Sequence, residues 1–168
     1  MKPPPALERL PVEAIPAALE KAAHCRLINE PAQAESICHD ILLVEPDNQR
    51  ALVILLLALS DRIGRGYAVG LVDAQRILPR LRDEYERAYY AGILCDRRAK
   101  ALLEQVHPGS PSDAYEYLRE AIDWYEKAEV LSPPGNSEAL LRRNTCARIL
   151  AGNPLGPHPE EPIRLQSE

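Results

Sequence analysis

Two segments far apart in the chain follow the same template. In residues 34–46 and again in residues 121–133, a small residue is followed by larger or apolar residues four, seven and ten places later, and then by a proline. This spacing marks one face of a helix with 3.6 residues per turn, and the proline ends that helix. Two helices with one template indicate repeated helical units, which bury their apolar faces by stacking on one another.

The first of these segments belongs to a complete helix-turn-helix unit. An apolar stripe that includes Ala22 and Cys25 precedes it, and a break that contains Pro31 separates the two helices. The unit resembles the tetratricopeptide repeat, a motif of about 34 residues in which small residues let two antiparallel helices approach closely. Ala22 stands where that family usually has glycine, and Cys25 and Cys38 replace aromatic residues. The resemblance covers roughly residues 15–151.

This resemblance implies an all-α fold of antiparallel helix-turn-helix repeats, stacked as a right-handed superhelix with a C-terminal capping helix. Asp47 is a good N-cap for a helix predicted at about residues 48–63, which begins a second unit. A further helix is predicted at about residues 71–82. The third unit begins with a helix predicted at about residues 83–106, which is longer than the family norm.

Two more helices complete the predicted domain. Residues 110–113 have the pattern of a capping box, with Pro111 at the first helical position. Asn136 is expected to cap a last helix at residues 137–151, which ends at Gly152 and Pro154. We expect this helix to cover the open end of the stack.

The chain divides into three parts. Residues 12–153 form the predicted repeat domain, residues 1–11 a flexible proline-rich N-terminus, and residues 154–168 a flexible proline-rich tail. An alternative is that Ile163 and Leu165 dock the tail on the domain.

The composition indicates one domain with a real core, because the chain has 168 residues of which 46% are apolar. The net charge is −5, and the arginines between residues 76 and 98 alternate with acidic residues, so nucleic acid is not an expected partner. The longest apolar run, residues 51–59, is about half the length that crosses a bilayer. With no evident secretory leader, we expect a cytoplasmic protein that does not bind membranes.

The cysteines allow more than one interpretation. All four are expected on packed helix faces as small apolar residues: Cys25, Cys38, Cys95 and Cys146. A competing hypothesis is a metal- or ligand-binding site made of His24, Cys25, Cys38 and His39. Adjacent helical residues point about 100° apart, so two inward cysteines leave both histidines pointing away. A disulfide between Cys25 and Cys38 is a third interpretation, which a reducing compartment disfavours.

No catalytic motif is evident, so we predict that the protein is not an enzyme and has no cofactor. The glycine-containing segment 64–70 lacks the preceding strand and the following lysine that a phosphate-binding loop needs. The histidines are scattered and form no metal-binding helix pair.

The predicted function is protein–protein interaction, as an adaptor or an assembly subunit. In tetratricopeptide proteins the first helix of each unit lines a concave groove. One subclass there clamps a partner's carboxylate with lysine and asparagine, and this chain has neither residue at the corresponding positions. The resemblance places an apolar, arginine-edged set of residues in the groove: Leu19, Arg26, Arg50, Val53, Leu57, Tyr89 and Arg97.

Two points about this groove stay open. Tyr89 could face a partner or pack against other tyrosines across the third helical hairpin. A helix over residues 51–59 would carry apolar side chains on every side, so Val53 and Leu57 need other residues to cover them from water. That cover is the third unit, a second copy of the chain, or a segment of a protein or peptide partner.

Overall fold

The computed structural model describes residues 3–64, 69–105 and 107–159. Within these ranges the chain forms seven α-helices and two 3₁₀-helices, and no strand. The all-α prediction is confirmed. The α-helices are α1 (Ile15–Leu27), α2 (Pro31–Val44), α3 (Gln49–Ser60), α4 (Val69–Ile77), α5 (Glu84–Glu104), α6 (Ser110–Leu131) and α7 (Glu138–Gly152). The 3₁₀-helices are η1 (Val12–Ala14) and η2 (Leu78–Arg80).

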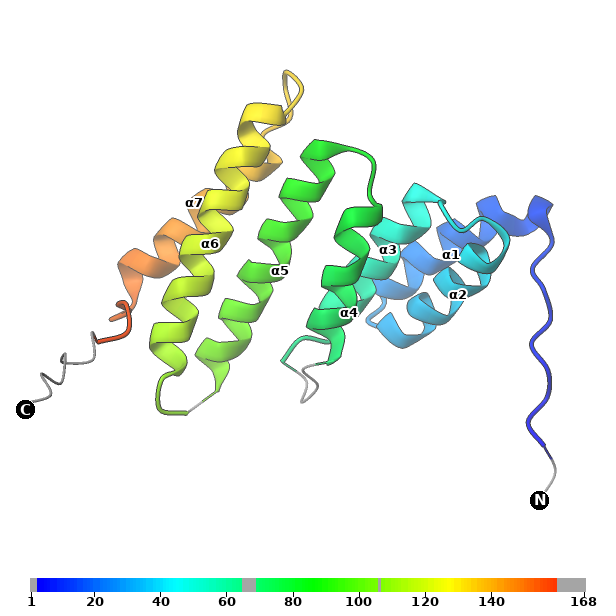
Figure 1. Ribbon diagram of the computed structural model, residues 1–168, viewed down its shortest axis with the longest axis horizontal. Helices are drawn as coiled ribbons and strands as arrows, with labels where there is room; N and C mark the ends of the chain where they lie inside the picture. Colours follow the sequence, from blue (N-terminus) through cyan, green and yellow to red (C-terminus); the bar gives the residue numbers. More distant parts are fainter. Residues whose placement is uncertain (1–2, 65–68, 106, 160–168) are drawn as a thin grey trace, which may run out of the picture.

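Helices that follow one another along the chain lie side by side. Figure 1 shows them as an elongated row, with α1 and α2 at one end and α6 and α7 at the other. Each of α2, α3 and α6 packs against the helix before it and the helix after it, whereas α4 and α5 share a smaller contact. Helix α1 also touches α3, so alternate helices meet as well.

The helix boundaries agree with the sequence pattern except where local chemistry intervenes. Helix α5 begins and ends within two residues of its predicted bounds. Helix α4 stops at Ile77, short of the predicted residue 82, and η2 follows with Pro79 near its start. Proline has no N–H to donate and restricts the residue before it, which explains the early end.

Two predicted caps are wrong in detail. The N-cap of α3 is Asn48, whose side-chain oxygen accepts a hydrogen bond from the Ala51 N–H at 2.9 Å, so Asp47 lies outside the helix. No capping box forms at residues 110–113, because Ser110 is itself helical and buried. Gly109, with φ of 90°, takes the N-cap position in the left-handed region that glycine tolerates.

The predicted cap of the last helix is confirmed in part. The Asn136 side chain accepts a hydrogen bond from the Glu138 N–H at 3.0 Å, although Ser137 occupies the N-cap position. Helix α7 ends at Gly152, one residue beyond the predicted bound.

The buried apolar side chains form two main clusters. One is built from α1 to α4 and η2 with Leu94 of α5, and the other from α5, α6 and α7. Leu57 of α3 and Tyr90 of α5 pack against both clusters. These two residues therefore connect the halves of the row.

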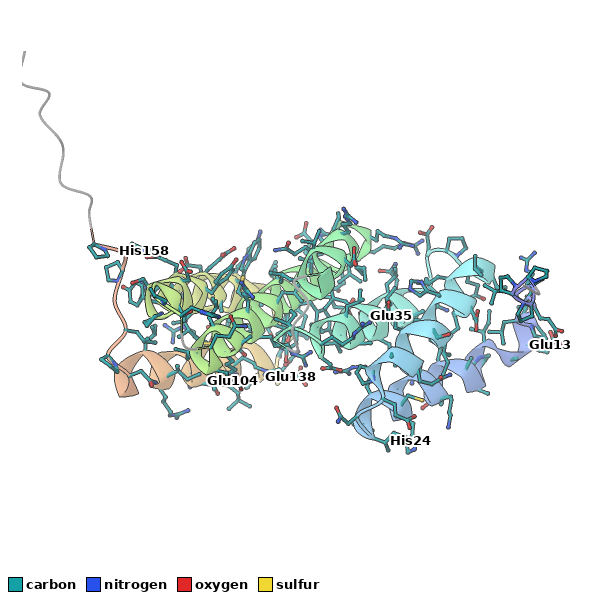
Figure 2. The ribbon with its side chains drawn as sticks, turned by 90° about the horizontal axis from the view of Figure 1, so that it is seen from below. Glu13, His24, Glu35, Glu104, Glu138 and His158 are labelled. Carbon is teal, nitrogen blue, oxygen red and sulfur yellow. The ribbon has the colours of Figure 1, made fainter. Side chains whose placement is uncertain are left out.

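Both ends of the described chain contact the helices. Leu10 packs against the first cluster, and Leu155 packs against the second. His158 Nε2 lies 2.8 Å from Asp113 Oδ1 at the start of α6. Figure 2 shows His158 beyond the end of α7. Ile163 and Leu165 lie outside the described residues, as does most of the loop between Gly64 and α4. No helix in the described ranges combines the length and apolar character that a membrane span requires.

Candidate partner-binding face

One stripe of α3 carries three of the seven predicted contact residues. Arg50, Val53 and Leu57 follow one another at helical spacing, and Asp61, the C-cap of α3, extends the stripe by four residues. Val53 and Leu57 are partly buried, whereas Arg50 is exposed. An apolar centre thus lies between charged side chains.

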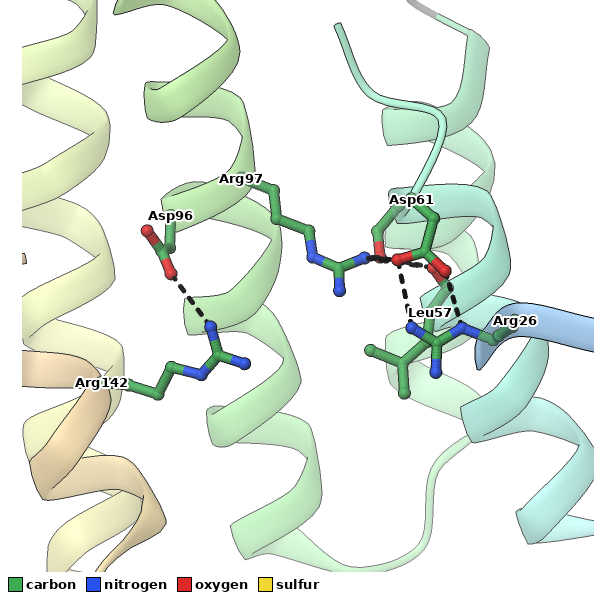
Figure 3. A network of polar contacts seen from close by, with 7 residues as sticks. Arg26, Leu57, Asp61, Asp96, Arg97 and Arg142 are labelled. Atoms are coloured by element: carbon green, nitrogen blue, oxygen red, sulfur yellow. Dashed lines mark hydrogen bonds and ion pairs between the residues drawn. The ribbon is translucent and has the colours of Figure 1, made fainter. Parts of the chain in front are cut away.

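Asp61 connects three helices. It accepts two hydrogen bonds from Arg26 of α1, from Nε to Oδ2 at 2.7 Å and from Nη2 to Oδ1 at 3.1 Å. Arg97 of α5 donates from Nη1 to Oδ1 at 2.5 Å, to the Leu57 carbonyl oxygen at 3.2 Å, and to the Ser60 hydroxyl. Figure 3 shows both guanidinium groups converging on this one carboxylate. The contacts bring α1, α3 and α5 onto a common face.

The charges of this cluster do not cancel. Two guanidinium groups share one carboxylate, and all three side chains are roughly a fifth to a quarter exposed, at 21 to 24%. The cluster lies at the C-terminus of α3, where the helix dipole also favours cations. One positive charge is therefore available to a further anionic group.

A second ion pair joins α1 and α3 at the other end of the stripe. Arg50 Nη2 lies 2.5 Å from Glu20 Oε1, and both side chains are more than half exposed. Exposed pairs of this kind contribute ~0–1 kcal/mol to stability. We call the surface formed by Arg26, Arg50, Val53, Leu57 and Arg97 the α1–α3–α5 face.

The remaining two predicted contact residues offer little surface. Leu19 is 8% exposed within the first cluster, and Tyr89 is 9% exposed within the second. The Tyr89 ring stacks on Tyr85 with 5.6 Å between centroids, and it lies 6.0 Å from the Tyr125 ring of α6. Of the two alternatives for Tyr89, the structure therefore has the one in which the ring packs against other tyrosines.

A buried carboxylate next to Arg97 escaped the sequence interpretation. Asp96 is fully buried, with Lys100 Nζ 2.8 Å from Oδ1 and Arg142 Nη1 of α7 3.6 Å from Oδ2. Neither oxygen has a well-oriented hydrogen bond among the described residues. In Figure 3, Asp96 reaches towards α7 while Arg97 reaches towards α3, so adjacent residues join α5 to both halves of the molecule.

Arg142 of α7 also hydrogen-bonds with Tyr89 of α5. Burial lowers the pKa of Arg142, but its hydrogen bond to Tyr89 and the nearby Tyr125 and Asp96 outweigh that and raise the pKa above its ordinary value. Arg142 therefore keeps its charge beside Asp96. The only sequence signal for this site was an acidic residue inside the apolar stretch of α5, with a lysine four residues later.

All four cysteines are free and buried, as the packing interpretation predicts. Burial raises the pKa of Cys38, Cys95 and Cys146 to about 12, so these thiols stay protonated near neutral pH. A thiol in that state is a poor nucleophile and a poor metal ligand.

The proposed His and Cys site is not assembled. Cys25 and Cys38 point into the packed interior, while His24 and His39 are exposed, as Figure 2 shows for His24. Across residues 3–64, 69–105 and 107–159, no group of three or more His, Cys, Asp or Glu side chains is arranged to hold a metal ion. No observation on these residues favours the metal-binding hypothesis.

Comparisons with known proteins give no relative from which a function could be transferred. A scan of protein-family models finds no match, and searches of curated proteins and of solved structures find none either. Any function must therefore be inferred from the chain's own residues.

Proposed function

We propose that this chain is a protein–protein interaction module, an adaptor or an assembly subunit, that binds a segment of a partner across the α1–α3–α5 face. We further propose that its helices stack as a tetratricopeptide-like right-handed superhelix with α7 as the cap. The sequential packing of α1 to α4 and the contact between α1 and α3 support this arrangement.

The observation that carries the proposal is the position of Val53 and Leu57. Both are partly buried apolar residues on a stripe flanked by the Arg50–Glu20 pair at one end and by the Arg26–Asp61–Arg97 cluster at the other. Protein interfaces commonly combine an apolar centre, where most of the binding energy resides, with a polar rim that limits the wrong partners. The face has both parts.

The roles of the residues follow from their exposure. Val53 and Leu57 supply the apolar contact, and Arg50 contributes mainly to the association rate, because its charge is exposed and screened by salt. Arg26 and Arg97 hold the three helices together through Asp61 and present one excess positive charge to the partner.

The test compares binding by matched variants. The full chain is used to capture proteins from a cell extract, which are identified by mass spectrometry, alongside Leu57→Asp and Leu43→Asp. Leu43 lies on α2 and is 64% exposed, so it controls for adding a charge to an exposed leucine. We expect partners that the wild-type chain and Leu43→Asp capture and that Leu57→Asp loses.

Folding must be checked because Leu57 also contacts both apolar clusters. Circular dichroism melts of each variant separate a lost interface from a lost fold, since an unpaired charge in a protein interior costs several kcal/mol. If Leu57→Asp unfolds, Val53→Lys with Arg50→Glu repeats the test with less disturbance of the interior. Folded variants that retain every wild-type partner contradict the proposed face.

A further inference from the structure

Helices α6 and α7 leave an open groove between them. They pack against each other at one end of the row, as Figure 1 shows, and residues of both helices line a cavity of about 510 Å³. Leu150 of α7 contributes apolar surface, and Ile122 of α6 also lines the groove although only 8% of it is exposed. The small side chain of Ala147 leaves room for a close approach. We refer to this cavity as the α6–α7 groove.

Helix α7, which forms one side of the groove, has few buried residues. Helix α7 has only Ala139 and Cys146 fully buried, and its Leu140 and Leu141 are 39% and 64% exposed. In the described part of the chain, no helix follows α7 to pack into the groove. The groove is therefore open to solvent.

The charges of the groove are balanced in sign. Arg119 and Asp123, one turn apart on α6, line it together with Glu126 and Arg143. Arg143 already pairs with Glu126 at 2.8 Å. Arg119 and Asp123 have no ion-pair partner among the residues that the structure describes. A strongly acidic or strongly basic partner would meet repulsion from one of these two groups.

We propose that the α6–α7 groove receives α6 of a second copy of the chain, in antiparallel orientation, so that the protein forms a two-fold symmetric dimer. In such a dimer the contact surface is the same on both copies, and if residue i contacts residue j, then j contacts i. A two-fold axis that passes α6 midway between Arg119 and Asp123, at the level of residue 121, places Arg119 of each copy opposite Asp123 of the other. The two unpaired charges of one chain thus neutralise the two of its partner.

Charge inversion tests this pairing. Sedimentation velocity of the full chain is measured over a roughly hundredfold range of concentration, because mass action makes a dimer concentration-dependent. We expect the wild-type chain to dimerise, and Arg119→Asp or Asp123→Arg alone to weaken the dimer by about tenfold or more, since each places like charges opposite one another. The double variant Arg119→Asp with Asp123→Arg restores it, because the charges are exchanged.

Lys127→Glu provides the matched control. It inverts an exposed charge on α6 beside Trp124, outside the α6–α7 groove, and leaves dimerisation unchanged. Circular dichroism of all variants confirms that the helices are intact. A chain that stays monomeric over the whole range overturns the proposal, and so does a dimer that both single inversions leave unchanged. A double variant as weak as the single variants also overturns it.

Discussion

Gly92 of α5 lies directly against the ring of Tyr125 of α6. A Cβ atom on Gly92 would be 2.6 Å from Tyr125 Cε1 and 2.8 Å from Cδ1, closer than carbon atoms pack. The missing side chain lets the two longest helices approach each other, and it allows the Tyr125 ring to be fully buried. Burial raises the pKa of the Tyr125 hydroxyl far above its ordinary value.

Replacing Gly92 with alanine should destabilise the protein. Alanine gains about 1 kcal/mol of helix propensity over glycine, but the added Cβ overpacks the interior against a ring that has no room to move, at a cost of ~1–3 kcal/mol. We expect a lower urea midpoint. Gly152→Ala is the control, because a Cβ there meets nothing within 4 Å. Equal or higher stability of Gly92→Ala would show that α5 and α6 separate readily.

Removing the Asp61 charge should loosen the junction of α1, α3 and α5. In Asp61→Asn, Arg26 and Arg97 face each other without their shared carboxylate, and the loss of hydrogen bonds to charged groups costs ~1–3 kcal/mol. Asp47→Asn is the comparison, because the pair that Asp47 forms with Arg82 is exposed and contributes ~0–1 kcal/mol. Chemical denaturation measures both variants. Similar losses would contradict the structural role of Asp61.

Removing the two cations that pair with Asp96 should destabilise the protein more than removing the negative charge of Asp96 itself. Replacing both Lys100 and Arg142 with methionine leaves a buried carboxylate without compensation, and breaking a buried pair in this way costs up to ~3–5 kcal/mol. Asp96→Asn costs less, because the two cations are about two-fifths exposed, at 39% and 41%, and can reach water. Denaturation midpoints of the two variants check the order. The reverse order would mean that the cations, and not Asp96, depend on the pairing.

The buried thiols should make the fold sensitive to alkaline pH. The pKa values of Cys38, Cys95 and Cys146 rise from 9.0 to about 12 on burial, so the folded state retains protons that the unfolded state loses. The contribution of these thiols to the free energy of unfolding is full below pH 9 and falls as the pH rises towards 12. Urea unfolding at a series of pH values measures the decline. In Cys38→Ala the decline should be shallower, and an unchanged slope would contradict the assignment.

Local patterns in the chain were sufficient to predict its helices. The four-three-three spacing, the prolines and the expected caps located the seven α-helices that the described residues form, because hydrophobic periodicity and the missing proline N–H act within a few residues. The small residues also identified interior contacts correctly: Ala34 and Ala121 are both fully buried. The errors fell at helix ends, where Asn48 and Gly109 compete with neighbouring residues for the cap.

The candidate site was only partly predictable. The helical stripe on α3 identified Arg50, Val53 and Leu57 as neighbours, but periodicity does not say how much of each side chain its surroundings cover. Leu19 and Tyr89 share the required spacing and are almost fully buried. Exposure depends on which helices pack alongside, which no local pattern contains.

Residues one or two turns apart are enough to specify a series of amphipathic helices with small residues at their contacts. The shared use of Asp61 by Arg26 and Arg97 is different, because Asp61 lies 35 and 36 residues away from them along the chain and meets them only in the folded molecule. The burial of Asp96 between α5 and α7 likewise depends on how the helices pack. Ion pairs at such separations form only after packing brings the helices together, because Coulomb attraction between solvated charges is too weak to select a partner beforehand.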